Sequence, residues 1–428
     1  MKIKIKKMDF ENVINKKRSK HIIPKKPNIA FRTLLRVASS FDLMATHFKI
    51  NKIGLEKLPK GEPCLYLMNH SSFIDLKIAS VVLYPKPFSI VCTSDGFIGK
   101  KWLMRNLGCI PTKKFVTDIA LIRDMLYSLK KLKCNVLMYP EAGYSFDGRA
   151  TVLPNSLGRC LKMLDVPVVM IKTYGAFSRD PLYNNLQLRK VDVSADMEYI
   201  LSREDIKEKS CGELNEIIQK HFNFDSFKWQ QENRIKIDEP FRADCLDRLL
   251  YKCPNCKAEG KMLGKGTEIK CHECGKSWTL DEYGYVRANE GETEFEHIPD
   301  WYDWERQCVR DEIDKSEYSL DIDCKILVLT DTKCLYDVGR GHLSHTFDGF
   351  HLTGYDNGID YFQKTGYSYS LNSDFYWYEI GDMISIGNNT ILYYCFPENN
   401  EKVVTKARLA AEELYKMKRG DERKVSKQ

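Results

Sequence analysis

The sequence has no long hydrophobic run. Across its 428 residues, no apolar stretch approaches the roughly 20 residues that a helix needs to cross a bilayer. The longest apolar stretches, such as 166–171, have the length of a buried strand. The basic first segment is not followed by the apolar core of a secretory signal. These absences predict a cytoplasmic chain that is neither exported nor anchored by a spanning helix.

The chain also has little net charge: +7 at neutral pH, which does not favour a nucleic-acid-binding protein. The positive charge is concentrated near the start, where basic residues are opposed only by Asp9 and Glu11. These basic residues are Lys2, Lys4, Lys6, Lys7, Lys16, Lys17, Arg18, Lys20, Lys25 and Lys26. An anionic membrane surface attracts each such residue by about 1 kcal/mol. The arm at 1–27 therefore indicates either peripheral membrane binding or a solvated tail.

The 15 cysteines fall into two groups. Most are isolated in apolar surroundings and are predicted to be reduced core residues. The other four form two C-x-x-C pairs, Cys253 with Cys256 and Cys271 with Cys274, separated by fourteen residues. Two such pairs can hold Zn²⁺ tetrahedrally with four thiolates, which leaves no open position for a substrate. They predict a structural zinc ribbon over residues 251–285.

From about residue 50 to 200, short apolar strands alternate with helical stretches. This alternation predicts an α/β domain in which helices cover a mixed sheet. Strands are expected at 64–68, 89–93, 109–112, 136–139, 168–173 and 188–193, and helices at 72–83, 97–107, 118–132 and across 203–250. Ligand sites in such sheets lie at the carboxyl ends of the strands.

Residues 28–48 have the period of an amphipathic helix, with Leu34, Val37, Phe41, Met44 and Phe48 on one face. Such a face can pack on its own domain or lie in a lipid interface. Packing is the commoner outcome, but the basic arm that precedes the helix favours the interface.

The last part of the chain has a different pattern. Residues 286–317 are acidic, contain Trp301 and Trp304, and are predicted to be a linker. Residues 318–420 show alternating strands with turn signals such as Gly387-Asn388-Asn389, closed by an amphipathic helix at 403–417. By pattern alone this β-rich segment resembles a pleckstrin-homology or GRAM-like domain, which implies lipid or protein binding.

The segment from Asn69 to Asp75 leaves the strand at 64–68 and enters a helix with serines at its start. The turn is expected to bring the Asp75 carboxylate back to the His70 imidazole. A carboxylate on one ring nitrogen fixes the tautomer, and the other nitrogen can then take a proton from a hydroxyl. In isolation, such a pair is more often a structural histidine bonded to a cap. However, a second polar, glycine-containing loop, 139–148, leaves another predicted strand about 70 residues later.

Four blocks in this order resemble the glycerolipid acyltransferases, which include the 1-acylglycerol-3-phosphate acyltransferases. The blocks are Asn69, His70 and Asp75; Gly108-Cys109-Ile110-Pro111 with Lys113 and Lys114; Pro140, Glu141 and Ser145; and Val166-Pro167-Val168-Val169. The resemblance covers roughly residues 28–200 and places an acyltransferase domain at 28–250. It implies acyl transfer from acyl-CoA or acyl carrier protein to a lysolipid or glycerol phosphate hydroxyl, with His70 as base and Asp75 as its partner.

The resemblance also implies that the second and third blocks bind the acceptor, through Lys113, Lys114, Glu141, Gly143, Ser145 and Arg149. The third block usually reads Pro-Glu-Gly-Thr-Arg-Ser, whereas this chain has Ala142, Gly143 and Tyr144 in the middle. The family arginine is therefore missing at 144. Lysine binds phosphate as a point charge and not as a bidentate fork. Lys113 and Lys114 are expected to replace the arginine only in part, and Arg149 is another candidate.

These observations favour a peripheral enzyme of phospholipid biosynthesis at the inner face of the cell membrane. The expected acceptor is a lysophospholipid, first of all 1-acylglycerol-3-phosphate. One alternative is a non-catalytic lipid- or protein-binding scaffold that keeps the acyltransferase fold. Another is nucleic-acid binding through the lysines of the zinc ribbon, but we expect no nucleic-acid partner because those lysines are more typical of a solvated face.

Overall fold

The protein is described here by a computed structural model that covers residues 3–16, 21–116, 118–356, 358–399 and 402–425, with side chains through 419. Two compact units are present. The α/β unit comprises Lys20–Pro181 and Gln187–Trp229, and the β-rich unit comprises Met1–Ser19, Leu182–Leu186 and Gln230–Gln428. Each unit is thus assembled from segments that are separated in the sequence.

A seven-stranded sheet forms the centre of the α/β unit, in the order β2-β8-β7-β3-β6-β4-β5. The strands are β2 (Lys49–Ile53), β3 (Leu65–Met68), β4 (Phe88–Thr93), β5 (Cys109–Thr112), β6 (Asn135–Met138), β7 (Val168–Tyr174) and β8 (Ser194–Leu201). All neighbours are parallel except β7 and β8, which are antiparallel. The predicted mixed sheet is confirmed.

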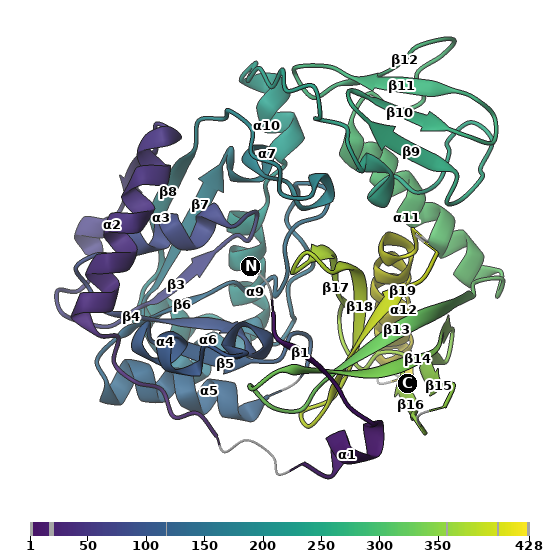
Figure 1. Ribbon diagram of the computed structural model, residues 1–428. Helices are drawn as coiled ribbons and strands as arrows, with labels where there is room; N and C mark the ends of the chain where they lie inside the picture. The colour runs from purple at the N-terminus through teal and green to yellow at the C-terminus, as the bar shows by residue number, and fades with distance from the viewer. Residues whose placement is uncertain (1–2, 17–20, 117, 357, 400–401, 426–428) are drawn as a thin grey trace. The chain divides into compact units, whose positions relative to one another are not determined.

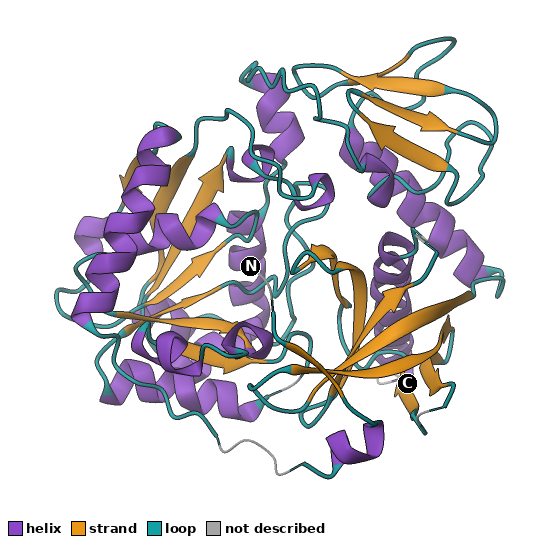
Figure 2. Cartoon of the chain, viewed as in Figure 1, coloured by secondary structure: helices purple, strands orange, loops and turns teal. Residues whose placement is uncertain are grey.

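Helices cover both faces of this sheet (Figures 1 and 2). They are α2 (Ile29–Ala45), α3 (Ile74–Val82), α4 (Lys101–Asn106), α5 (Ile119–Leu126), α6 (Leu157–Leu164), α7 (Ala176–Arg179), α8 (Arg203–Glu208) and α9 (Cys211–Phe222). Because successive side chains of a strand point to opposite faces, Tyr66 and Met68 of β3 join a core with α3, and Leu65 and Leu67 join a core with α5, α6 and α9.

Two predictions for this region are wrong. Residues 188–193 form no strand, although Val191 and Val193 are buried as the alternation suggested. The backbone amide of Val191 bonds to the carbonyl of Arg189, two residues earlier, so this segment turns locally and pairing starts only at β8. The helical prediction across 203–250 also extends too far: after α10 (Ser226–Glu232), only the short turn Leu246–Arg248 is helical up to residue 250.

Four of the five apolar residues predicted on one face of 28–48 do not pack on their own domain, whereas the fifth, Phe48, follows α2 and packs against the core. Leu34, Val37, Phe41 and Met44 are between 51% and 65% exposed. The helix instead contacts α3 through its other side, where Leu43 is buried and the hydroxyl groups of Ser39 and Ser80 lie 2.9 Å apart. None of the described helices combines the length and apolar character needed to cross a membrane.

The β-rich unit contains an eight-stranded sheet in the order β16-β15-β14-β13-β19-β18-β17, with β1 paired to β14. The strands are β1 (Ile5–Lys7), β13 (Leu320–Leu329), β14 (Leu335–Thr346), β15 (Gly349–Gly354), β16 (Asp360–Lys364), β17 (Asn372–Trp377), β18 (Gly381–Gly387) and β19 (Leu392–Pro397). The closing helix is present as α12 (Val404–Val425) and buries Ala407, Ala410 and Leu414.

Part of the basic arm is ordered. β1 pairs in parallel with β14, with Ile5 opposite Leu335, and the short helix α1 (Phe10–Ile14) follows. Lys4, Lys6 and Lys7 are exposed along this strand. Lys2, Lys17, Arg18 and Lys20 lie outside the described residues. Residues 5–7 of the arm therefore form the edge of a sheet and not a solvated tail.

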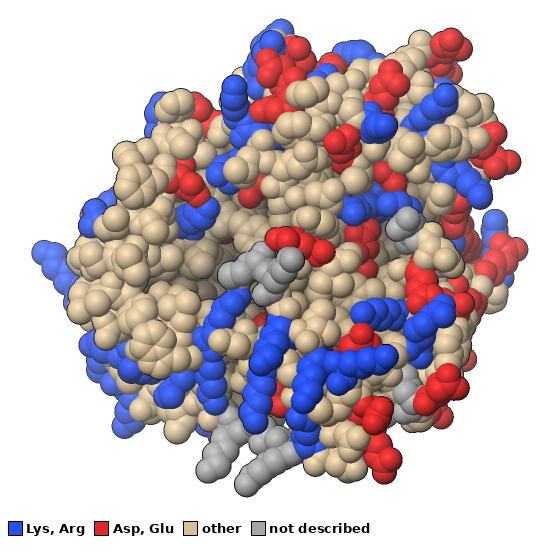
Figure 3. Space-filling view, viewed as in Figure 1, with Lys and Arg blue, Asp and Glu red and all other residues tan. Residues whose placement is uncertain are grey.

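A separate four-stranded antiparallel sheet carries the cysteine pairs. Its strands, in the order β12-β11-β10-β9, are β9 (Met262–Lys265), β10 (Glu268–Cys271), β11 (Ser277–Leu280) and β12 (Val286–Ala288). The helix α11 (Ile298–Asp314), where the sequence suggested only a linker, packs the buried Trp301 edge-on against Trp278 at 5.1 Å. In Figure 3, acidic and basic side chains are interspersed over this sheet and helix.

Candidate active site and cysteine cluster

His70 lies just beyond the end of β3, at the centre of the seven-stranded sheet. β6 and β7 flank β3 and run parallel to it, so the carboxyl ends of these three strands meet at one edge of the sheet. Asn69 fixes this edge because its side-chain oxygen accepts from the backbone amide of Thr173, near the carboxyl end of β7, at 2.8 Å. Its amide group donates to the Ser71 hydroxyl at 3.1 Å.

Asp75 occupies the first turn of α3 and faces back to His70. Its Oδ2 lies 3.0 Å from His70 Nδ1 and also accepts from the backbone amides of Ser71 at 2.8 Å and Ser72 at 3.1 Å. Because a carboxylate can only accept, the neutral imidazole carries its proton on Nδ1 and keeps the lone pair on Nε2. The arrangement can therefore present a base at Nε2 and stabilise the imidazolium that forms when this base takes a proton.

The surroundings keep His70 neutral. Burial lowers its pKa from the ordinary value of 6.5, and the positive charge of Lys114 lowers it further. The hydrogen bond and the charge of Asp75 act in the opposite direction but are outweighed. The His70 side chain is 19% exposed, so the imidazole is largely desolvated but still within reach of a ligand.

The loop that follows β6 is bonded to the backbone of His70. Glu141 accepts from the amide of His70 through Oε2 at 2.7 Å and from the amide of Thr151 through Oε1 at 2.8 Å. The amide of Ser145 in turn donates to the His70 carbonyl at 3.0 Å. Burial raises the pKa of Glu141 to about 7. Each Glu141 oxygen thus accepts from a backbone amide, so this carboxylate ties the loop to the backbone of His70.

The remaining predicted acceptor residues divide into two groups. Ser145 and Arg149 are engaged within the loop: the Ser145 hydroxyl donates to the Arg149 carbonyl at 2.6 Å, and Arg149 Nε donates to Asp147 Oδ2 at 2.6 Å. Gly143 is buried. Lys113 and Lys114 follow β5 and are half-buried, and the charge of Lys114 reaches His70.

Two tyrosines that the sequence did not single out as contacts of His70 stack on its ring. The Tyr139 ring centroid lies 4.2 Å from that of His70, with 27° between the planes. The Tyr144 centroid lies 4.0 Å away at 31°. Both belong to the loop whose Pro140-Glu141 pair resembles the family motif, but nothing in the sequence indicates the direction of their rings.

A buried carboxyl group beside the His70–Asp75 pair was also missed. Asp180 follows α7, lies 3.4 Å from Arg179 and interacts with the Ser72 side chain. Burial raises its pKa to about 6. A signal was available, because Arg179-Asp180 comes soon after β7 at the same edge of the sheet as His70.

In the β-rich unit, Cys253, Cys256, Cys271 and Cys274 form one cluster, with all four sulfur atoms within 4.8 Å of one another. The Sγ atoms of Cys253 and Cys274 are 3.8 Å apart, and those of Cys256 and Cys271 are 3.7 Å apart. Thiolates placed tetrahedrally around Zn²⁺ at about 2.3 Å would lie about 3.8 Å from one another. The donor set and its spacing therefore fit a four-thiolate metal site.

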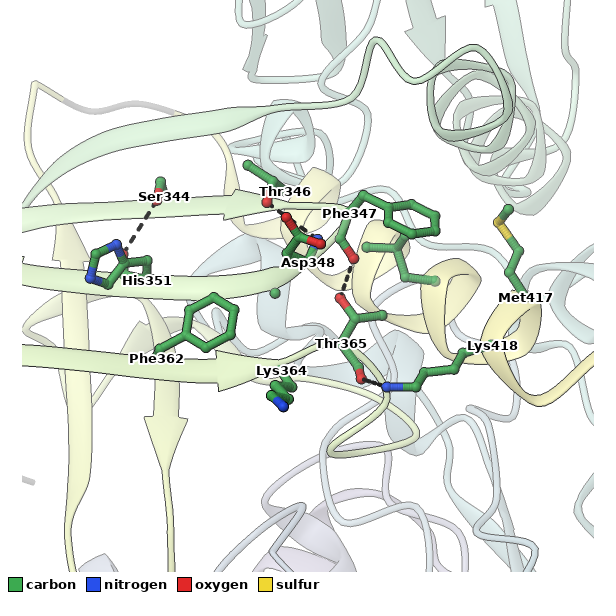
Figure 4. Close-up of a pocket in the computed structure, with 12 residues that line it drawn as sticks. Ser344, Thr346, Phe347, Asp348, His351, Phe362, Lys364, Thr365, Met417 and Lys418 are labelled. Carbon is green, nitrogen blue, oxygen red and sulfur yellow. Dashed lines mark hydrogen bonds between the residues drawn. The ribbon is translucent and has the colours of Figure 1, made fainter. Parts of the chain in front are cut away.

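The β-rich unit also has a cavity of about 620 Å³ between β14, β15, β16 and α12 (Figure 4). Phe347, Phe362 and Met417 supply apolar surface, and Lys364 and Lys418 supply charge. Lys418 donates to the carbonyl of Thr365 at 2.8 Å. His351 also lines the cavity and pairs with Asp360 at 2.8 Å, but these side chains are 44% and 80% exposed, unlike the buried carboxylate of the His70–Asp75 pair.

The His70 region is similar to known proteins. Residues 49–172 match the family model described as Acyltransferase. Over 133 residues, the chain is 27% identical to the chloroplastic 1-acyl-sn-glycerol-3-phosphate acyltransferase BAT2 of Brassica napus. This match covers 30% of the chain and 38% of that relative, so the chain spans less than two fifths of the relative's length.

Among solved structures, the chain is similar to the 1-acyl-sn-glycerophosphate (LPA) acyltransferase PlsC from Thermotoga maritima. The TM-score is 0.37 and the identity 16%, over 45% of this chain and 76% of that one. The family match at 49–172 includes His70, Asp75 and the loop that carries Glu141. The segment that matches the Acyltransferase model is thus the one that carries the His70–Asp75 pair.

Proposed function

We propose that the protein is an O-acyltransferase that moves a fatty acyl group from acyl-CoA or acyl carrier protein to the hydroxyl of a lysophospholipid. The acceptor to test first is 1-acylglycerol-3-phosphate, in phospholipid biosynthesis. The observation that carries this proposal is the His70–Asp75 pair within the segment that matches the Acyltransferase model, with Nδ1 held by the carboxylate and Nε2 left as a base.

In the proposed reaction, His70 Nε2 takes the proton of the acceptor hydroxyl as its oxygen attacks the thioester carbonyl. The resulting tetrahedral intermediate collapses to an oxygen ester and expels the thiolate. The thiolate then takes the proton from Nε2, which regenerates the neutral imidazole. Asp75 stabilises the imidazolium between the two proton transfers, and no covalent enzyme intermediate is required.

We assign Glu141 to positioning the base and Lys114 to binding the acceptor phosphate. Glu141 holds the His70 backbone, because its two oxygens bond to the amides of His70 and Thr151. Lys114 is the cation best suited to a phosphate group, since its charge already acts on His70, whereas the Arg149 side chain is paired with Asp147.

The experiment offers the purified full chain a panel of lysophospholipids with acyl-CoA or acylated carrier protein and detects products by mass spectrometry. His70→Ala is expected to abolish transfer. His47→Ala is the matched control, because His47 also pairs with a carboxylate, Asp192, but is 74% exposed in its side chain. Transfer by His70→Ala at the rate of the control would refute the proposal.

One observation supports a second candidate, a non-catalytic lipid-binding scaffold: Tyr144 covers His70 in the structure. The same panel separates the two candidates. Saturable lysolipid binding without product, for every donor, would favour the scaffold over the enzyme.

We further propose that the α/β unit docks on the inner face of the cell membrane through α2. The exposed apolar side chains of this helix are joined by Trp102, which is 70% exposed and packs edge-on against Phe31 at 5.2 Å. The surface over α2 carries few charged groups in Figure 3. An exposed apolar helix face with an aromatic residue is typical of interfacial binding.

The membrane proposal is tested by sedimentation with vesicles of phosphatidylglycerol and phosphatidylcholine. The double variant Phe41→Ser, Met44→Ser is expected to reduce binding strongly. Leu188→Ser is the control, because Leu188 is equally exposed but lies outside α2. If the double variant binds like the control, α2 is not the docking face.

For the β-rich unit, we propose that the four cysteines hold a structural Zn²⁺ in a zinc ribbon, which would stabilise the four-stranded sheet without acting on substrate. We further propose that residues 318–420 are a PH/GRAM-like module that binds lipid or protein. The alternating strands and closing helix support this module, and binding of the full chain to lipid arrays, compared with a variant at Lys364 and Lys418, would test it.

A further inference from the structure

The imidazole of His70 lies between two tyrosine rings. The Tyr139 and Tyr144 centroids are 4.2 and 4.0 Å from that of His70, and both planes are within about 31° of the imidazole plane. Two six-membered rings at this distance and tilt cannot share one face of a five-membered ring without overlapping. They therefore cover opposite faces, and only the ring edge remains open.

The open edge is further restricted. Asp75 occupies the Nδ1 side, so an acceptor hydroxyl must approach Nε2 along the edge that passes between the two tyrosines. Tyr144 forms the outer side of this approach and continues into Phe73, whose ring centroid lies 5.6 Å away. Phe73 is 55% exposed, so together these two rings present an aromatic surface to an incoming molecule.

Charge near this surface does not favour an anion. Asp75 and Glu141 are both buried next to His70, and Asp147 balances the charge of Arg149. The positive charge that reaches His70 comes from Lys114, on the segment after β5, and not from the loop that carries Tyr144. An aromatic face attracts cations and apolar groups and offers nothing to a phosphate dianion.

We propose that Tyr144 is a specificity-determining residue that forms, with Phe73, an aromatic wall of the acceptor site. The uncharged glycerol carbons beside the reacting hydroxyl pack against this wall, and an anionic headgroup is directed away from it, towards Lys114. This inference rests on the proposed acyl transfer, which it extends by assigning acceptor selection to the ring at 144.

The test compares kcat/KM for two acceptors that share an acyl chain, 1-acylglycerol-3-phosphate and the uncharged monoacylglycerol. Tyr144→Phe keeps the wall and should stay close to wild type for both. Tyr144→Ala removes the wall and should raise KM for both. Tyr144→Arg places a cation there and should raise the preference for the phosphate acceptor by about tenfold, as one charged hydrogen bond would. Tyr127→Ala, a half-exposed tyrosine on the helical segment after α5, is the control.

A second readout does not depend on turnover. Diethyl pyrocarbonate modifies exposed imidazoles, and peptide mass spectrometry gives the rate at His70 alone. Tyr144→Ala should speed this reaction by severalfold, and each acceptor should protect His70 at a concentration that reports its binding. In Tyr144→Arg the protecting concentration should fall for the phosphate acceptor only.

The outcomes separate the two ideas. If no acceptor is acylated but protection shifts as described, acyl transfer is refuted and the role of Tyr144 stands. If transfer occurs and Tyr144→Arg leaves the acceptor preference unchanged, the wall is refuted while the enzyme stands. An unaltered His70 modification rate in Tyr144→Ala would also overturn the proposal, provided that the variant unfolds at the wild-type temperature.

Discussion

Asp75→Asn is the substitution that most sharply tests the proposed role of the His70–Asp75 pair. The Asp75 oxygen at this site accepts from His70 Nδ1 and from the amides of Ser71 and Ser72. Asparagine keeps the shape and can still accept from both backbone amides. Because the same oxygen also faces Nδ1, the imidazole tautomer is kept, and the substitution removes only the negative charge beside the imidazole.

The expected loss follows from the geometry. With Nδ1 3.0 Å from the carboxylate oxygen, the charge centres of imidazolium and carboxylate are about 4 Å apart, which corresponds to about 4 kcal/mol at an effective dielectric constant of about 20. At 1.36 kcal/mol per decade this is about 10³-fold in rate. With the tautomer unchanged, kcat should fall by about this factor.

The assay measures release of the free thiol from acyl-CoA in the presence of lysolipid, together with thermal unfolding. Asp75→Asn should unfold close to the wild-type temperature, because the two backbone bonds are kept. Asp75→Ala should lose about 2–3 kcal/mol of stability as well as activity, since it leaves the amides of Ser71 and Ser72 buried without their acceptor. If Asp75→Asn retains activity within tenfold of wild type, the carboxylate does not support a base at His70.

Three further changes test other parts of the structure. Ala142 has φ +56°, so Ala142→Gly should stabilise the chain by about 0.5–1 kcal/mol in thermal unfolding. Gly143→Ala should leave stability unchanged, because the added carbon meets nothing within 4 Å. Equal effects of the two substitutions would contradict the loop geometry. Burial lowers the pKa of His70, and only the neutral imidazole is a base, so the acid limb of kcat/KM should have its midpoint below pH 6.5. A midpoint above this value would refute the assignment of His70 as the base. Cys274→Ser should lower bound zinc, measured by elemental analysis, from about one per chain and lower the unfolding temperature, whereas Cys308→Ser should do neither.

The central strands could be predicted because each is a short apolar run whose burial on both faces is visible in the sequence. Strands at the margin of the sheet could not. β2 has the sequence Lys-Ile-Asn-Lys-Ile and is mostly exposed. β8 follows a segment whose buried valines, Val191 and Val193, gave the alternation of a strand although the segment forms none. Both 188–193 and β8 alternate, but only β8 pairs with the neighbouring strand β7. The position of β7, and not local composition, decides which segment becomes a strand.

The same distinction applies to the site. The contact between His70 and Asp75 spans five residues and one turn, so local geometry suffices to expect it. The bond from His70 to Glu141 spans 71 residues and depends on β3 and β6 being neighbours in the sheet. The resemblance of Pro140-Glu141 to the family motif therefore predicted an acceptor contact, but the bonds of both Glu141 oxygens to backbone amides could not be predicted from it.

The bonds between His70 and the loop that follows β6 explain how this loop can differ from the Pro-Glu-Gly-Thr-Arg-Ser pattern while the proposed base stays in place. His70 donates from its amide to Glu141 and accepts at its carbonyl from Ser145, so the two ends of the stretch 141–145 are bonded to the base itself. The three positions that depart from the pattern, 142 to 144, lie between these bonds. Ala142 retains a left-handed backbone that suits glycine, which indicates that the path of the loop is kept although the side chain has changed. Substitution within the stretch can thus alter the wall that faces the acceptor while the imidazole and its carboxylate stay in place. Acceptor choice and base strength are therefore expected to vary independently, and changes at Tyr144 should affect KM for the acceptor more than kcat.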